Sequence, residues 1–65
     1  MICEIRFLSR GAKFDKTIAR SDRECASMEE ALRWAAATLK ASTPEDQAQV
    51  TSVRVRVVVP GGANA

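Results

Sequence analysis

Valine and arginine alternate near the end of the chain over residues 53–57, and two more valines follow at residues 58 and 59. A period of two is the period of a β-strand, in which successive side chains point to opposite faces of a sheet. The odd-numbered valines are therefore expected to form one apolar face, while Arg54 and Arg56 point the other way. We expect a strand from about residue 51 to residue 59 that stops at Pro60, which cannot donate a hydrogen bond to a sheet.

The same alternation opens the chain and predicts a first strand over residues 2–9, with Glu4 and Arg6 on its polar side. Arg10 and Gly11 interrupt the pattern, and glycine permits the positive φ of a tight hairpin turn. A second strand is expected from residue 12 to about residue 20. With a two-residue loop, the predicted cross-strand pairs are Ser9 with Ala12, Phe7 with Phe14, Arg6 with Asp15, and Cys3 with Ile18.

This register places Lys16 on the apolar face, opposite Ile5. An inward-pointing lysine protects the edge of a sheet from pairing with another strand. The second strand is therefore expected to be an edge strand. Residues 21–26, which are polar, are expected to form a turn.

A helix is predicted to begin at Ser27, because Ser27 and Glu30 have the spacing of a capping box. Its apolar residues fall on one stripe, which is expected to lie on the sheet: Met28, Leu32, Ala35, Ala36 and Leu39. Thr43 and Pro44 form a second helix-start signal, from which we expect a single turn.

The predicted order is ββαβ, which gives a two-layer α+β fold with a three-stranded antiparallel sheet. The third strand can lie beside the first, which gives the strand order 2-1-3 with the helix covering one face. The alternative order is 1-3-2, with the third strand in the centre. We expect residues 1–59 to form a single domain and residues 60–65 to form a flexible tail without packing side chains.

A chain of 65 residues is close to the lower limit for a self-sufficient core. The chain has two cysteines and no histidine, so a zinc site of the common kind is not expected. No export signal or membrane-spanning apolar run is apparent, which predicts a cytoplasmic protein without a membrane partner. In that compartment a disulfide is not expected, so Cys3 is predicted as a core thiol and Cys25 as a loop thiol. With a metal site and a disulfide not expected, a second subunit is the remaining way to add stability to the small core.

The sequence does not predict an enzyme, and it predicts no bound cofactor. Histidine and tyrosine are absent, which removes the commonest general base. Glu4 and Asp15 are predicted among exposed cations, where a carboxylate has no reason to carry the raised pKa of a catalytic acid. Cys25 has acidic neighbours that oppose a thiolate, and no glycine-rich phosphate loop opens a helix.

The leading hypothesis is a non-catalytic interaction module, acting as an adaptor or inhibitor of a partner protein. The third strand offers an unprotected edge that invites a second strand, which predicts a two-fold homodimer with a six-stranded sheet. A pairing centred on Val57 is preferred to one centred on Val55, which would set Arg54 against Arg56 of the copy. Trp34, on the helix flank, either covers the rim of the core or contacts a partner. The predicted partner-binding residues are Trp34, Arg54, Arg56 and Val57.

The alternative hypothesis is a nucleic-acid-binding regulator that uses a basic sheet face. The formal net charge is only +2, although its cations gather on the polar side of the predicted sheet. No aromatic residue is predicted on that side, so stacking of single-stranded bases is not expected. A solvated face of cross-strand ion pairs is the simpler interpretation. The candidate phosphate contacts are Arg6, Lys13, Arg54 and Arg56.

Overall fold

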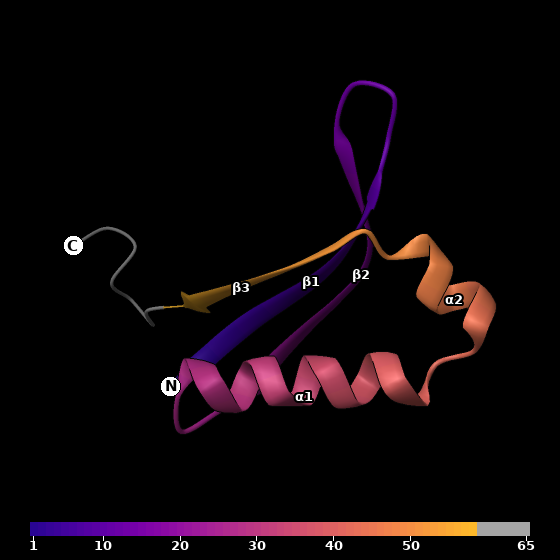
Figure 1. Cartoon of the computed structure of the whole chain (residues 1–65). Coiled ribbons are helices and arrows are strands. Elements are labelled where there is room, and N and C mark those ends of the chain that lie inside the picture. Colours follow the sequence, from indigo (N-terminus) through magenta and orange to yellow (C-terminus); the bar gives the residue numbers. More distant parts are fainter. Residues whose placement is uncertain (59–65) are drawn as a thin grey trace.

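The computed structural model describes residues 1–58, and its elements are β1 (Ile2–Arg10), β2 (Asp15–Glu24), α1 (Met28–Ala41), α2 (Pro44–Gln49) and β3 (Ser52–Val58). The strands form an antiparallel sheet in the order β2-β1-β3, and α1 lies across one face of it (Figure 1). The predicted two-layer α+β fold and the strand order 2-1-3 are confirmed. Residue 59, the stop at Pro60 and the predicted tail lie outside the described residues.

The alternation of β1 and β3 is found as the sequence predicts. Ile5 lies opposite Val55, Cys3 opposite Val57 and Phe7 opposite Val53. These odd-numbered residues point to the side covered by α1, and the even-numbered residues form the outer sheet face. Among the described residues, β3 has one neighbouring strand and therefore forms one edge of the sheet.

The predicted hairpin register is wrong. β1 continues to Arg10, which pairs with Asp15, and a bulge between Phe7 and Leu8 shifts the register so that Phe7 lies opposite Ala19. Lys16 consequently pairs with Ser9 instead of Ile5. The full set of predicted pairs is replaced: Ser9 does not pair with Ala12, Phe7 with Phe14, Arg6 with Asp15 or Cys3 with Ile18.

The second strand also begins and ends later than predicted, and residues 21–24 belong to β2 instead of a turn. The longer loop contains Gly11, where an added Cβ would collide with the backbone carbonyl oxygen of Phe14. The hairpin extends beyond the end of the β1–β3 pairing (Figure 1). Phe14, predicted to pack against Phe7, is 81% exposed in this loop.

The predicted cap of α1 is confirmed, since the Ser27 hydroxyl accepts a hydrogen bond from the backbone N–H of Glu30. The Glu30 carboxylate accepts one from the N–H of Ala26, one residue before the cap. In α2, the Thr43 hydroxyl accepts from the N–H of Asp46 and Pro44 is the first helical residue. The second helix is six residues long, somewhat more than the single turn expected.

The buried face of α1 differs from the predicted stripe. Ala31 and Ala35 are buried, whereas Met28 is 41% and Leu32 50% exposed. The helix is rotated because the Trp34 ring packs against Phe7, with ring centroids 6.3 Å apart. Two small alanines then face the sheet, which lets the helix approach it closely.

The core is small. Ile5 and Cys3 are the largest side chains that are fully buried. The radius of gyration is 12.9 Å, compared with about 11 Å for a compact domain of this length. The buried cluster is formed by Cys3, Ile5, Phe7, Cys25, Ala31 and Ala35, with Trp34, Leu39, Val50, Val53 and Val55 packed at its margin.

Candidate interaction surfaces

An apolar surface lies along the free side of β3. Trp34 stacks under Arg23 of β2 and so marks the β2 side of α1. Successive helix residues are about 100° apart around the helix axis. Leu32 therefore lies about 80° from the midpoint between the buried Ala31 and Ala35, on the side opposite Trp34 and toward β3. Because α1 runs antiparallel to β3, its first turns lie beside the end of that strand, where Val57 is 36% exposed. Met28, Leu32 and Val57, with the outer backbone edge of β3, are here called the β3 edge surface.

Trp34 lies at the rim of the core. It is half-buried and packs on Phe7, and the guanidinium carbon of Arg23 lies 4.4 Å from its ring centroid. Such a cation–π contact stabilises by about 0.5–1 kcal/mol at an exposed site. The ring therefore has partners within its own chain, and a contact with another protein stays a prediction.

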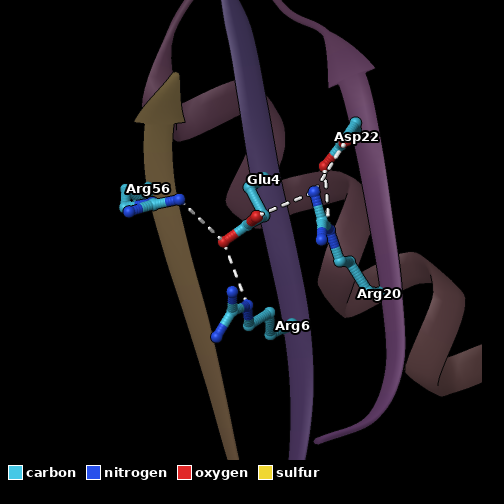
Figure 2. Close-up of polar contacts among 5 residues, drawn as sticks. All are labelled: Glu4, Arg6, Arg20, Asp22 and Arg56. Carbon is cyan, nitrogen blue, oxygen red and sulfur yellow. Dashed lines mark hydrogen bonds and ion pairs between the residues drawn. The ribbon is translucent and has the colours of Figure 1, made fainter. Parts of the chain in front are cut away.

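The outer sheet face carries a buried carboxylate under arginines (Figure 2). Glu4, on the central strand, is only 4% exposed. Its Oε1 lies 3.0 Å from Arg6 Nε and 3.5 Å from Arg56 Nη2, and its Oε2 lies 3.1 Å from Arg20 Nη2. The Arg6 contact is an ion pair without hydrogen-bond geometry, since the buried Arg6 Nε has no hydrogen-bond partner. Sequence reasoning expected Glu4 to be exposed, and this expectation is wrong.

Arg20 joins two carboxylates on neighbouring strands. Asp22 lies directly opposite Glu4, and Arg20 Nη2 donates to Asp22 Oδ2 at 3.2 Å. The hydrogen bond with Asp22, aided by the charges of Asp22 and Glu4, raises the pKa of Arg20. Sequence reasoning did not select Arg20, because the wrong hairpin register separated it from Glu4.

Three arginines form a row across the sheet: Arg20 lies opposite Arg6, which lies opposite Arg54. Arg54 makes no ion pair with another described residue. Together with Arg56, Glu4 and Asp22, these residues carry a formal charge of +2. Glu24, opposite Ile2 on the same face, is ion-paired with the Met1 amino group. The structure thus brings together three of the predicted phosphate contacts, Arg6, Arg54 and Arg56. The fourth, Lys13, lies in the hairpin loop, and so does not belong to the row.

The two cysteines are close together and buried. Both are free thiols, and the prediction of a core thiol at Cys3 is confirmed. Cys25 lies in the loop between β2 and α1, as predicted, and it is also buried, at 4% exposure. Burial, and next the neighbouring Cys3 side chain, raises the pKa of Cys25 above its usual 9.0. A buried thiol with a raised pKa is a poor nucleophile at neutral pH.

An open cavity of about 320 Å³ lies between the sheet and the end of α1. Phe7, Ile18, Leu39 and Val50 form its apolar walls, and Asp46 is the titratable residue at its edge. Within residues 1–58, no group of three or more metal-ligating side chains is found. None of the described helices is long and apolar enough to cross a bilayer.

Comparison with known proteins gives no match: no protein-family model, no curated protein and no solved structure resembles this chain.

Proposed function

We propose that this protein is a non-catalytic association module that forms a two-fold homodimer through the β3 edge surface. β3 of one protomer would pair antiparallel with β3 of its copy and join two three-stranded sheets into one of six strands. The proposal is supported by the exposure of Met28 and Leu32 on α1, a helix that contacts β3, and by the position of β3 at an edge of the described sheet. An unprotected edge with apolar neighbours favours the addition of a strand.

The side chains on β3 favour this pairing. Val53, Val55 and Val57 occupy the face toward the helix, and none of the described β3 residues directs a charge to that side. Sheets that avoid pairing commonly place a lysine there. A small core gives a further reason for association, since within residues 1–58 the largest side chains that are fully buried are Ile5 and Cys3.

The position of the two-fold axis can be argued from charge. A pairing centred on Val55 would set Arg54 of each protomer against Arg56 of the other, and like charges directly opposed are destabilising. A pairing centred on Val57 sets Arg56 against Val58 instead. The Val57 axis also passes beside the first turns of α1, where Met28 and Leu32 are exposed.

The two helices would then be close enough for side chains to meet. Strands are spaced by about 4.8 Å, so β1 of each protomer would lie about 7 Å from the axis. α1 contacts both β1 and β3, which places the two α1 axes about 10–14 Å apart, just beyond the usual packing distance of helices. Met28 and Leu32 would contact their copies across this space. An extended segment of another protein could occupy the same edge, which is the basis for an adaptor or inhibitor role.

Sedimentation of the purified chain tests the proposal. The expected mass is twice the 7.1 kDa of the chain at concentrations from about 10 μM to about 1 mM. Val57→Lys should give a monomer, because it places a charge on the helix-side face of β3, and an inward-pointing lysine protects an edge strand from pairing. Thr17→Lys is the matched control, since it places the same side chain on the opposite edge strand and should leave the mass unchanged.

A second variant separates loss of association from loss of folding. Leu32→Glu changes a half-exposed helix residue, so it should dissociate the dimer while the far-ultraviolet circular dichroism stays that of the folded chain. A wild-type protein that remains monomeric over the whole concentration range contradicts the proposal. An unchanged dimer mass in both variants means that the contact lies on another surface.

A further inference from the structure

We infer that the outer sheet face binds the phosphate backbone of double-stranded nucleic acid, with Arg20, Arg6 and Arg54 as the contacting row. This inference goes beyond the proposed dimer, because the row is complete within one chain. Its partner chemistry follows from the charge, the spacing and the exposure of the arginines.

The row concentrates like charge in a way that favours an anion above it. Arg20, Arg6 and Arg54 occupy directly paired positions on three neighbouring strands. Like charges directly opposed on a sheet are destabilising, and the carboxylates that contact these arginines, Glu4 and Asp22, offset only half of the charge of Arg6, Arg20, Arg54 and Arg56. An anion lying across the row would offset the remaining repulsion.

The spacing of the row suits a nucleic-acid backbone. Two strand spacings of about 4.8 Å give the row a length of about 10 Å. Over about 10 Å, a duplex presents about three phosphates on each strand. Arginine is also the cation whose planar group pairs best with phosphate oxygens, through two parallel hydrogen bonds.

Glu4 acts in this surface as a positioning residue. Its carboxylate contacts Arg6, Arg20 and Arg56 while being almost fully covered. The arginine side chains above it are 36–65% exposed, so their outer nitrogen atoms can be reached by a ligand. Holding long side chains in place before binding reduces the entropy lost on complex formation.

The composition of the face favours a duplex over a single strand. Phe7 and Trp34 pack on the side of the helix, and Phe14 lies in the hairpin loop. No aromatic residue within 1–58 belongs to the outer sheet face on which the arginine row lies. Proteins that hold single strands stack bases on aromatic rings, which this face does not offer. A regular backbone with exposed phosphates needs only the row of cations.

The test is fluorescence anisotropy of a labelled duplex of mixed sequence, titrated with the protein at several salt concentrations. Binding should weaken steeply with salt, with a slope of log affinity against log salt of about −3 for three phosphate contacts. Arg54→Gln should reduce this slope by about 1. Arg54 is the suitable residue because it has no ion pair within residues 1–58, so its removal leaves the other contacts in place.

Arg33→Gln is the matched control. Arg33 is an exposed arginine of α1, on the opposite layer, and its change removes the same charge. The slope of this variant should equal that of the wild type. Equal slopes for Arg54→Gln and Arg33→Gln would overturn the assignment of the face, since binding would then depend on net charge alone.

Glu4→Gln and Asp22→Asn test the positioning role, because each removes one carboxylate charge from the same face. Among the described residues, the Asp22 carboxylate is ion-paired with Arg20 alone, so its change should strengthen duplex binding by charge alone. Glu4→Gln releases three arginines and should bind more weakly than Asp22→Asn. Equal affinities would remove Glu4 from the proposal.

Three results overturn the inference as a whole. They are no duplex binding at about 50 mM salt, binding that does not change with salt, and tighter binding to an acidic polypeptide than to the duplex. The last result would assign the face to a protein partner. Failure of the proposed dimer is distinguishable, because a monomeric Leu32→Glu variant retains the whole row and should keep the salt slope per chain.

Discussion

Replacing Ile5 with alanine is expected to remove a large part of the stability of this fold. Ile5 is fully buried on the central strand, between Ser21 of β2 and Val55 of β3. The change deletes three carbon atoms, which at about 0.8 kcal/mol per buried methylene gives about 2.4 kcal/mol. The cavity left behind adds to this loss, so we expect about 3 kcal/mol, within the usual range for such substitutions.

That loss is large for a chain of this size. A stability of about 0.05–0.15 kcal/mol per residue gives about 3–10 kcal/mol for the whole domain. Ile18→Ala is the matched control, since it also deletes three carbon atoms but from a side chain of β2 that is 40% exposed and lies away from the proposed dimer surface. Its expected cost is about 1 kcal/mol, roughly half of the transfer free energy without a cavity.

Urea unfolding followed by circular dichroism measures both variants. The chain concentration must be the same in each experiment, because dissociation of a dimer would be linked to unfolding. Ile5→Val provides an intermediate point, with an expected cost of about 1 kcal/mol. If Ile5→Ala cost no more than Ile18→Ala, the assignment of the β1 face that meets α1 would be refuted.

Three further predictions concern the amino terminus, a thiol and the hairpin. The Met1 amino group contacts Glu24, which raises its pKa above 8.0, and burial raises the pKa of Cys25 above 9.0. Both groups hold their protons more tightly in the folded chain, so the melting temperature should be steady below pH 8 and fall as the pH rises above it. Glu24→Gln should reduce that fall. Cys25 should react with a thiol reagent at pH 7 only at the rate of unfolding, which a comparison in urea would measure. Gly11→Ala should destabilise the hairpin by about 1–3 kcal/mol in urea unfolding, because the new Cβ collides with the Phe14 carbonyl group.

The sequence predicts the register of a strand well where one face of the strand is apolar, and poorly where neither face is apolar. β1 alternates from Cys3 to Phe7 and β3 from Val53 to Val57, so a shift by one residue would expose the valines, and the register is determined. β2 is different, since nine of its ten residues are exposed. Its pattern does not define a face, and the choice of a turn at Arg10 and Gly11 rested on local chemistry alone. The observed register depends on contacts of residues 21–25 with the start of β1, which local patterns do not contain.

The error in the α1 face has a related cause. A stripe chosen by hydrophobicity follows the largest apolar side chains, Met28 and Leu32. The structure instead buries Ala31 and Ala35, because a helix that lies close to a sheet needs small residues at the contact, and because Trp34 occupies the β2 side. The two large side chains are left beside β3. The proposed dimer surface could therefore be found only after the helix was placed.

Stability alone gives a poor explanation for Glu4 and its arginines. A buried carboxylate loses the hydration of its charge, and its ion pairs offset this loss only in part, so an apolar residue in the same place is often as stable or more stable. Three arginines in one row add repulsion that a sheet of ordinary cross-strand pairs would not contain. Binding of a polyanion does need such charges, held in a fixed array before the ligand arrives. The arrangement is therefore better explained by a requirement for a charged surface than by a requirement for a stable sheet.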